Sequence, residues 1–298
     1  MKTNTGINLN ANGKTQHVCW ILIAALAILL VTLAATGVVK NGGVGILVVC
    51  IFSIIHGINR YGIKNMLMFF IISSVISWSY ESLSIISGFP FGHYYYSDVL
   101  GAKIGLVPII IIMSYFGVAY LAWSIGQVLI DQQNSQLKGA SVFTIPMIAS
   151  FVMVIWDLAF DPFASTINQA WIWENGGGYF GVPIVNFLGW YLCTFTIFIT
   201  FSLFLKYTFY KKQPNIDDPS TQQMLTPCAM YGALSLQHLL NIFMKDDTVI
   251  TSLDNRIWEA SGINEALTMV CLFTMGFVVV LSVIKLLTKK PEKEQVMQ

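Results

Sequence analysis

The sequence predicts an all-α, polytopic membrane protein. Of its 298 residues, 55% are hydrophobic and only 10% are charged, whereas soluble domains carry about 25% charged residues. Long apolar runs recur along the chain, each close to the roughly 20 residues that a spanning helix needs. The net charge of +1 gives no sign of a basic face for nucleic acid. We therefore expect the lipid bilayer, and no nucleic acid, as a partner.

The apolar runs predict about eight spanning helices. By residue number the predicted spans are 17–37, 43–58, 66–87, 105–130, 140–160, 183–207, 224–244 and 263–287. The second is short, and the seventh is the least apolar because it contains Gln237, His238 and Asn241. The first run is long and lacks a small-residue cleavage pattern, so we expect a span there rather than a cleaved signal peptide.

The domain organisation predicted from these runs is simple. Residues 1–16 are polar and predict a disordered cytoplasmic tail, residues 17–287 form a single transmembrane domain, and residues 288–298 form a charged cytoplasmic tail. No separate soluble domain is expected.

The distribution of basic residues predicts the orientation of the chain. With eight spans, 12 of the 16 Lys and Arg residues fall on the side that holds both termini. The four on the other side are Lys40, Lys103, Lys245 and Arg256. Because cytoplasmic loops carry the excess of basic residues, we expect both termini in the cytoplasm and the protein in the cell (plasma) membrane.

Two loops on the predicted outer side share one plan. In each, a helix carrying an acid leads to a loop rich in Gly and aromatic residues, a Val-Pro step opens the next helix, and an aromatic residue follows seven positions after the proline. The corresponding pairs are Glu81 and Asp157, Pro108 and Pro183, and Tyr115 and Trp190. Proline suits the first turn of a helix, where its missing N–H needs no partner. This shared sequence pattern predicts a helix-hairpin pseudo-repeat.

Four acidic residues on this side are candidate catalytic residues: Glu81, Asp98, Asp157 and Asp161. Asp157 and Asp161 are four apart, so in a helix they share one face. Two partly desolvated carboxylates repel each other, and at least one is expected to keep a proton near neutral pH, which a general acid requires. The alternatives are a helix stop at Asp161-Pro162 and a turn at Asp98.

Aromatic and polar residues in the same loops are candidate substrate-binding residues. They are His93, Tyr94, Tyr95, Tyr96, Trp156, Trp171, Trp173, Tyr179, Asn186 and Trp190. Trp and Tyr also gather at membrane interfaces in general. The functional alternative is a pocket wall for a long apolar substrate, with ring faces that stabilise a cationic intermediate.

Metal and cofactor motifs are missing from the sequence. No HxxxH, HExxH or CxxC spacing occurs, and no P-loop or dinucleotide fingerprint is present. The five cysteines are widely spaced in apolar runs and are expected to be buried small hydrophobes. We therefore predict neither a metal nor a cofactor.

Two stretches resemble a family of membrane carotenoid-biosynthesis proteins that includes carotenoid 1,2-hydratases, gamma-carotene 1'-hydroxylases and bisanhydrobacterioruberin hydratases. The first is Glu81…Gly88-Phe89-Pro90-Phe91-Gly92-His93-Tyr94-Tyr95-Tyr96-Ser97-Asp98…Gly101…Val107-Pro108, and the second is Asp157-Leu158…Asp161-Pro162…Trp171…Trp173…Gly178-Tyr179-Phe180-Gly181-Val182-Pro183…Asn186-Phe187…Gly189-Trp190. The chain departs from the family pattern at His93, where many relatives have an acidic or other polar residue, and in the helix after Pro108, which lacks the usual Trp.

The resemblance implies a hydro-lyase that adds water to the terminal double bond of an acyclic isoprenoid and leaves a tertiary hydroxyl group. In the mechanism that we predict, Asp157 or Glu81 protonates the alkene. Aromatic faces shield the tertiary cation, and a water held by Asp161 or Asp98 captures it. Two alternatives remain open. One is another membrane enzyme of lipid or isoprenoid modification, and the other is a transporter or lipid-binding protein, because half-repeats and intramembrane carboxylates also occur in transporters.

Overall fold

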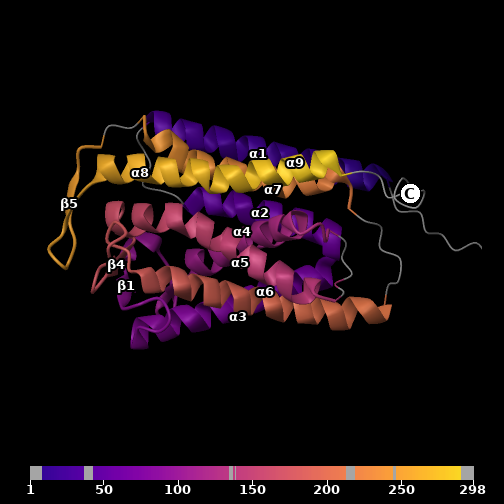
Figure 1. Ribbon diagram of the computed structural model, residues 1–298, viewed down its shortest axis with the longest axis horizontal. Helices are drawn as coiled ribbons and strands as arrows, with labels where there is room; N and C mark the ends of the chain where they lie inside the picture. Colours follow the sequence, from indigo (N-terminus) through magenta and orange to yellow (C-terminus); the bar gives the residue numbers. More distant parts are fainter. Residues whose placement is uncertain are drawn as a thin grey trace, which may run out of the picture.

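Long helices run side by side along one axis of the molecule (Figure 1). The computed structural model describes residues 9–36, 43–133, 137, 139–212, 219–243 and 246–289. The helices are α1 (Leu9–Thr36), α2 (Gly43–Tyr61), α3 (Ile63–Ser87), α4 (Ile109–Leu129), α5 (Ser141–Asp161), α6 (Ile184–Lys212), α7 (Thr221–Asn241), α8 (Ala260–Phe273) and α9 (Met275–Thr288). A short 3-10 turn, η1 (Asp98–Leu100), and a π-helical turn, η2 (Pro162–Ile167), complete the helical elements.

The strands are short and lie in the connections. They are β1 (Tyr94–Tyr96), β2 (Lys103–Ile104), β3 (Val107–Pro108), β4 (Trp171–Trp173), β5 (Val249–Thr251) and β6 (Ile257–Glu259). They pair as three two-stranded ribbons, β1 with β4, β2 with β3, and β5 with β6. Figure 1 shows β1, β4 and β5 at one end of the bundle, opposite the end where α9 leads to the C-terminus.

The predicted fold class, an all-α polytopic membrane protein, is confirmed. Within the described residues, seven segments are long and apolar enough to cross a membrane, and α8 with α9 counts as one of them. The predicted seventh span corresponds to α7, which is as long as α4 but is not among these seven. Its polar residues Ser235, His238 and Asn241 are buried. They face protein rather than lipid, which explains how a less apolar helix lies inside the bundle.

Two predicted boundaries shift in the structure. Helix α1 begins at Leu9, so residues 9–16 are helical rather than part of an irregular tail, since nothing in that polar stretch stops the helix. The last predicted span breaks at Thr274, whose φ and ψ of −111° and −68° depart from the values of about −63° and −42° that continue an α-helix. The remaining predicted tail residues, 1–8 and 290–298, lie outside the described residues.

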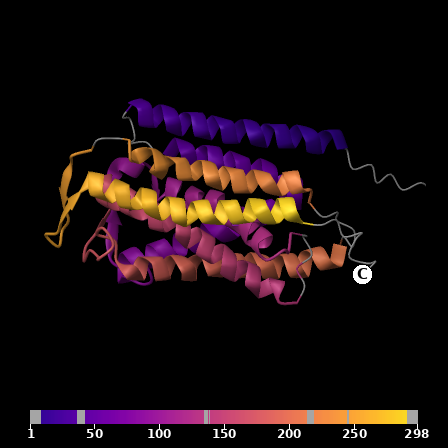
Figure 2. The same ribbon diagram turned by 45° about the horizontal axis from the view of Figure 1, so that its top comes forward.

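Helix α4 forms the centre of the bundle. Of its most apolar window, 83% is buried, against 22% for α1, which Figure 2 shows along the outside. Small residues let its neighbours approach closely. A Cβ at Gly117 would lie 3.0 Å from Sγ of Cys50 on α2, and one at Gly126 would lie 3.1 Å from Ala149 on α5.

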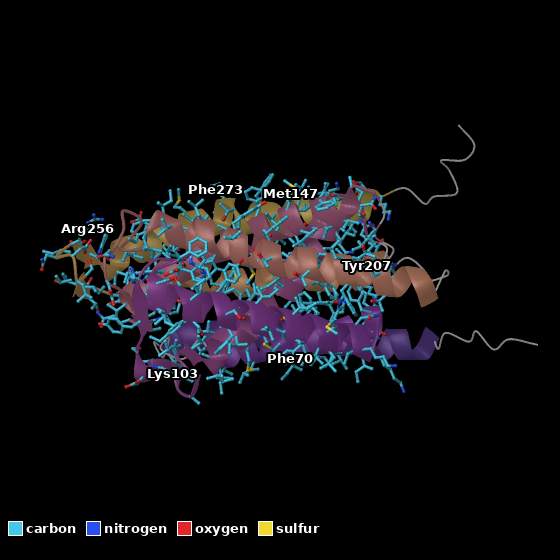
Figure 3. All side chains as sticks on the ribbon, turned by 90° about the horizontal axis from the view of Figure 1, so that it is seen from below. Phe70, Lys103, Met147, Tyr207, Arg256 and Phe273 are labelled. Atoms are coloured by element: carbon cyan, nitrogen blue, oxygen red, sulfur yellow. The ribbon has the colours of Figure 1, made fainter. Side chains whose placement is uncertain are left out.

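The surface separates apolar flanks from polar ends. Figure 3 shows Phe70, Met147 and Phe273 along the sides of the bundle and Lys103 and Arg256 at the end with the ribbons. The three flank residues are between 40% and 67% exposed. Large exposed apolar side chains around a bundle are expected where lipid is the solvent. The chain is therefore a multi-pass membrane protein.

The two ends of the bundle should lie on opposite sides of the membrane. Asp98, after β1, has a fully exposed side chain, and Lys64, at the start of α3, is also exposed. In Asp98→Cys and Lys64→Cys variants, an impermeant maleimide should label only one in intact cells and the other after permeabilisation. The basic-residue distribution predicts Asp98→Cys as the first. The native cysteines give little background because all five are buried. Equal labelling of both variants in intact cells would contradict this topology.

Candidate active site

The β1–β4 ribbon joins the two loops that the sequence relates by its pseudo-repeat. The strands are antiparallel, with Tyr94 opposite Trp173 and Tyr96 opposite Trp171. Residues two apart on a strand project to the same face, so these four rings share one face. The Tyr94 and Trp173 ring centroids are 4.9 Å apart, and those of Tyr96 and Trp171 are 6.0 Å apart. Tyr95, on the other face, is 46% exposed.

Glu81, near the end of α3, accepts three phenol hydrogen bonds. Tyr94 and Tyr96 both donate to Oε2, the latter at 2.8 Å. Tyr115 of α4 donates to Oε1, also at 2.8 Å. Glu81 is only 3% exposed, so these hydroxyls replace the water that a buried carboxylate loses. The arrangement matches the acceptor capacity of an ionised carboxylate, which has no proton to donate.

Burial and the charge of Glu81 keep the two ribbon tyrosines neutral. Desolvation first, and then the nearby Glu81 carboxylate, raise the pKa of both Tyr94 and Tyr96 well above the ordinary value for a phenol. Both groups therefore remain O–H donors over the whole physiological range of pH.

Asp157 and Asp161 lie one turn apart at the end of α5 and share one donor group. The amide nitrogen of Asn186 donates to Oδ2 of Asp161 at 2.6 Å and to Oδ2 of Asp157 at 3.1 Å. The indole N–H groups of Trp171 and Trp173 approach Oδ1 of Asp161 at 3.2 and 3.4 Å. Asp161 therefore accepts from three N–H donors, and the ribbon that holds Glu81 also holds Asp161.

Asp157 is the one carboxylate of the three with an incomplete set of partners. It is 0% exposed, and in the described part of the chain its Oδ1 is a buried atom with no hydrogen-bond partner. A buried ionised oxygen without a donor is costly, and the carboxylate of Asp161 one turn away adds repulsion. The geometry therefore favours a proton on Asp157 rather than on Asp161.

After Asp161 the chain stays helical, but the helix changes from the α to the wider π type at Pro162. Helix α5 continues into η2, where the N–H of Asn168 donates to the carbonyl of Phe163 at 3.0 Å, a π-type bond. The hydroxyl of Ser165 donates to the carbonyl of Asp161 at 2.8 Å. A π-turn accommodates a proline that cannot donate, and such turns are frequent at functional sites. The α-helix thus ends at Asp161, as the alternative of a helix stop at Asp161-Pro162 predicts, but the chain continues in a π-helical turn rather than in an irregular loop.

The two aromatic residues that follow the prolines of the pseudo-repeat stack on each other. The rings of Tyr115 and Trp190 lie 4.4 Å apart and nearly parallel, at 6°. Trp156 packs edge-on against Trp190 at 5.9 Å. Because Tyr115 also binds Glu81, this stack connects the carboxylate of α3 to the aromatic cluster beside α5.

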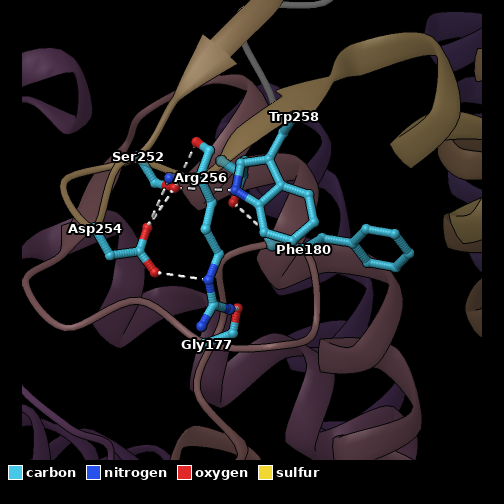
Figure 4. Close-up of polar contacts among 7 residues, drawn as sticks. Gly177, Phe180, Ser252, Asp254, Arg256 and Trp258 are labelled. Atoms are coloured by element: carbon cyan, nitrogen blue, oxygen red, sulfur yellow. Dashed lines mark hydrogen bonds and ion pairs between the residues drawn. The ribbon is translucent and has the colours of Figure 1, made fainter.

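The β5–β6 hairpin contacts the loop that contains Gly176, Gly177 and Gly178, called the glycine-rich loop below, as Figure 4 shows. Arg256 donates through Nη1 to the carbonyl of Gly177 at 2.7 Å, and its Nε lies 3.2 Å from Oδ2 of Asp254. The ring of Trp258 lies 6.1 Å from that of Phe180. The hairpin thus contacts the loop through both a cation and an aromatic ring.

Gly177 also packs against Val182 and Pro183, directly before the helix that carries Asn186. A Cβ at Gly177 would lie 2.1 Å from the carbonyl oxygen of Val182 and 2.4 Å from Cα of Pro183, so only glycine fits. Pro183 precedes α6 directly, and Asn186 is in its first turn. The glycine-rich loop is therefore pressed between the hairpin and the start of α6.

The structure brings most of the predicted site residues together but not all of them. Asp98 has a fully exposed side chain that pairs with Lys103 at 3.4 Å, so its interpretation as a turn residue is the better one. His93 is exposed, with its ring against Gly88. Tyr179 is half-buried, and its hydroxyl donates to the carbonyl of Leu158 rather than to a carboxylate. No group of three or more His, Cys, Asp or Glu side chains that could hold a metal occurs within the described ranges.

Sequence reasoning missed three residues of the site region. Tyr115, which donates a hydrogen bond to Glu81, appears in the sequence as the counterpart of Trp190 in the pseudo-repeat, but nothing else in the sequence marks it as a site residue. Arg256 and Trp258 gave no signal in the sequence, since they lie in the separate β5–β6 hairpin.

His238 of α7 also lies near the site. Its ring packs against Phe163 of η2 at 5.8 Å, behind the turn that follows Asp161.

Residues 41–252 match the family model described as carotenoid biosynthesis protein. The chain belongs to the carotenoid biosynthesis protein family. The match covers more than half of the chain and includes both loops of the ribbon, so it confirms the resemblance seen in the sequence. It ends before Arg256, β6, α8 and α9. No curated protein and no solved structure matches the chain. Family and fold together make this a membrane protein of carotenoid modification.

Replacing Asn186 by leucine should destabilise this carotenoid biosynthesis protein. The change removes the donor shared by Asp157 and Asp161, and hydrogen bonds to charged groups contribute about 1.5–3 kcal/mol each. We expect the free energy of unfolding to fall by roughly 3 kcal/mol, measured by denaturation in detergent with tryptophan fluorescence. Asn175→Leu, at an exposed position of the neighbouring loop, is the control and should change it by less than about 0.5 kcal/mol. Equal effects of the two variants would argue against a shared donor.

Replacing Arg256 by alanine should loosen the glycine-rich loop without unfolding the bundle. The variant loses the contacts with Gly177 and Asp254, so amide hydrogen exchange over residues 174–181 should accelerate while the β1–β4 ribbon stays protected. Lys103→Ala, which removes an exposed ion pair at the same end, should leave that exchange unchanged. If exchange in the loop is the same in wild type and Arg256→Ala, the hairpin does not hold the loop.

Proposed function

We propose that this protein is a carotenoid hydratase that adds water across the terminal double bond of an acyclic isoprenoid end group. The observation that carries the proposal is the uneven pairing of three buried carboxylates at one aromatic cluster. Glu81 and Asp161 each accept three hydrogen bonds, whereas Asp157 accepts one and keeps an unpaired oxygen. Protonating an alkene requires one neutral acid among anionic stabilisers.

In the proposed reaction, Asp157 is the general acid. Its proton passes from Oδ1 to C2 of the terminal alkene, the π electrons form the new C–H bond, and a tertiary cation remains at C1. The unpaired oxygen is the one that is free to carry this proton. Glu81, which the sequence left as an equal candidate, is better suited to remain an anion because all three of its partners are donors.

Water capture completes the reaction without any net change in protonation. A water attacks C1, a C–O bond forms, and the released proton returns to the Asp157–Asp161 pair. Because both Asp157 and Asp161 accept from the same nitrogen of Asn186, Asp161 can take up the proton first and pass it to Asp157, whose unpaired Oδ1 carries it in the starting state. The product is a tertiary alcohol, and the aspartate pair returns to its starting protonation state. The reaction therefore requires no oxidant or reductant.

The surroundings of the carboxylates suit a cationic intermediate. The carboxylate of Glu81 and the rings of Trp156, Trp190 and Tyr115 are held by their mutual contacts before the reaction, which is the arrangement that stabilises developing charge. Asp157 at 0% and Asp161 at 1% exposure are shielded from bulk water, which limits premature loss of the proton.

The test is co-expression with an acyclic carotenoid, followed by mass spectrometry of the extracted lipids. The wild type should convert the substrate to a product that is heavier by one water, and growth in heavy-oxygen water should label the new hydroxyl group. Asp157→Asn should lower the conversion by at least about 100-fold, the usual contribution of a general acid. Asp98→Asn, at the exposed acid that lies outside the cluster, should retain it.

Three outcomes would contradict the proposal in different ways. Water addition that persists in Asp157→Asn would remove this residue as the acid. If the wild type leaves the carotenoid unchanged but a deletion strain accumulates another isoprenoid, the protein modifies a different lipid. Proton-dependent uptake of an unchanged ligand into proteoliposomes would instead indicate a transporter.

A further inference from the structure

A second polar cluster lies at the opposite end of the bundle, around Arg60 in the last turn of α2. Arg60 is 8% exposed. Its guanidinium donates to Oε1 of Gln127 at 2.8 Å, to the carbonyl of Gln133 at 2.5 Å, and to the sulfur of Met224. All three acceptors are neutral, and a thioether is a weak acceptor. None of the ion pairs found among the described residues involves Arg60.

The unpaired atoms in this cluster are all N–H donors. They are Nε of Arg60, Nε2 of Gln127 and Nε2 of Gln133, each buried without a hydrogen-bond partner. Flipping the amides does not remove them, because their oxygens are already in use. Oε1 of Gln127 accepts from Arg60 and from Tyr61 at 2.9 Å, and Oε1 of Gln133 accepts from Lys289 at 2.5 Å. Three buried donors therefore lack an acceptor.

Positive charge exceeds negative charge around these donors. Lys285 pairs with Asp131 at 2.7 Å and donates to the carbonyl of Leu129 at 2.6 Å, while Arg60 and Lys289 contact only neutral acceptors in the described structure. The carbonyl ends of α2, α4 and α9 favour cations here, which explains why basic residues gather. It does not explain the donors that remain unpaired, because those carbonyls do not accept from them.

We propose that Arg60, Gln127, Gln133 and Lys289 form a binding site for a phosphate-type oxyanion. A phosphate group offers several acceptor oxygens to match the three donors, and guanidinium and phosphate geometries are complementary. The site lies at the end of the bundle, where the phosphate groups of lipids lie. The sequence also places most basic residues on this side, as is typical of the leaflet that carries anionic lipids. The oxyanion can belong to a lipid headgroup or to free phosphate.

Thermal unfolding of the full chain in maltoside micelles, which contain no phosphate, tests this site. Three additions are compared: phosphatidylglycerol, inorganic phosphate, and a phosphate-free galactolipid. Selective binding to the folded state should raise the midpoint by roughly 2 °C or more with phosphatidylglycerol and not with the galactolipid. An equal rise with inorganic phosphate identifies free phosphate as sufficient, whereas a rise with the lipid alone identifies a headgroup.

Variants decide whether the shift arises at Arg60. Arg60→Gln should abolish it, and Lys289→Gln, which keeps the buried guanidinium and so guards against a folding defect, should reduce it. Lys64→Gln, an exposed lysine at the same end, is the matched control and should retain the full shift. The proposal is overturned if no phosphate compound shifts the midpoint, in which case water alone satisfies the donors, or if Lys289→Gln and Lys64→Gln behave alike. Neither result depends on the hydratase proposal, because the carboxylates lie at the other end.

Discussion

Buried carboxylates must find hydrogen-bond donors, and in this protein the β1–β4 ribbon supplies them. Among the described residues, four of the six donor side chains that contact Glu81 and the aspartate pair come from two facing strands, Tyr94 and Tyr96 from one and Trp171 and Trp173 from the other. The antiparallel register sets these rings on one face, so a single small ribbon serves carboxylates on α3 and α5. Without it, Glu81 would keep only Tyr115 as a donor and Asp161 only Asn186, and a buried carboxylate that loses its partners is unfavourable by several kcal/mol.

The uneven distribution of these donors distinguishes the three carboxylates from one another, and the proposed chemistry depends on that difference. If all three carboxylates were equally paired, none would be favoured as the proton carrier. Asp157 stands apart because the ribbon does not reach its Oδ1, and because it shares with Asp161 the one amide nitrogen that Asn186 provides. In the hydratase that we propose, an acid and two anions would therefore arise from similar side chains through their partners, as in other sites where environment separates paired carboxylates.

The helical bundle and the hairpin keep this arrangement in place. Helix α4 packs closely through glycine and alanine and carries Tyr115 to Glu81, while Trp190 of α6 stacks on the same tyrosine. Outside the bundle, Arg256 and Trp258 press the glycine-rich loop toward the start of α6. The Arg60 cluster occupies the other end, so acidic and basic buried groups are separated along the length of the molecule. That separation agrees with the uneven distribution of basic residues between the loops, from which we expect the two ends of the bundle to lie on opposite sides of the membrane.

The sequence by itself determined the fold class, the approximate spans, and a set of four candidate acids, three of which the structure brings together. Composition and apolar run length suffice for spans because lipid demands them, and the i, i+4 spacing of Asp157 and Asp161 follows from helix geometry alone. The pseudo-repeat also marked Tyr115 and Trp190 as equivalent positions, and they are in contact. Only the tertiary structure decided which donors reach which acid. Tyr115 is 34 residues from Glu81, and periodicity relates only neighbours within a helix or strand. The exposure of Asp98, the π-turn after Asp161 and the unpaired oxygen of Asp157 likewise depend on how separate segments pack, which no local pattern encodes.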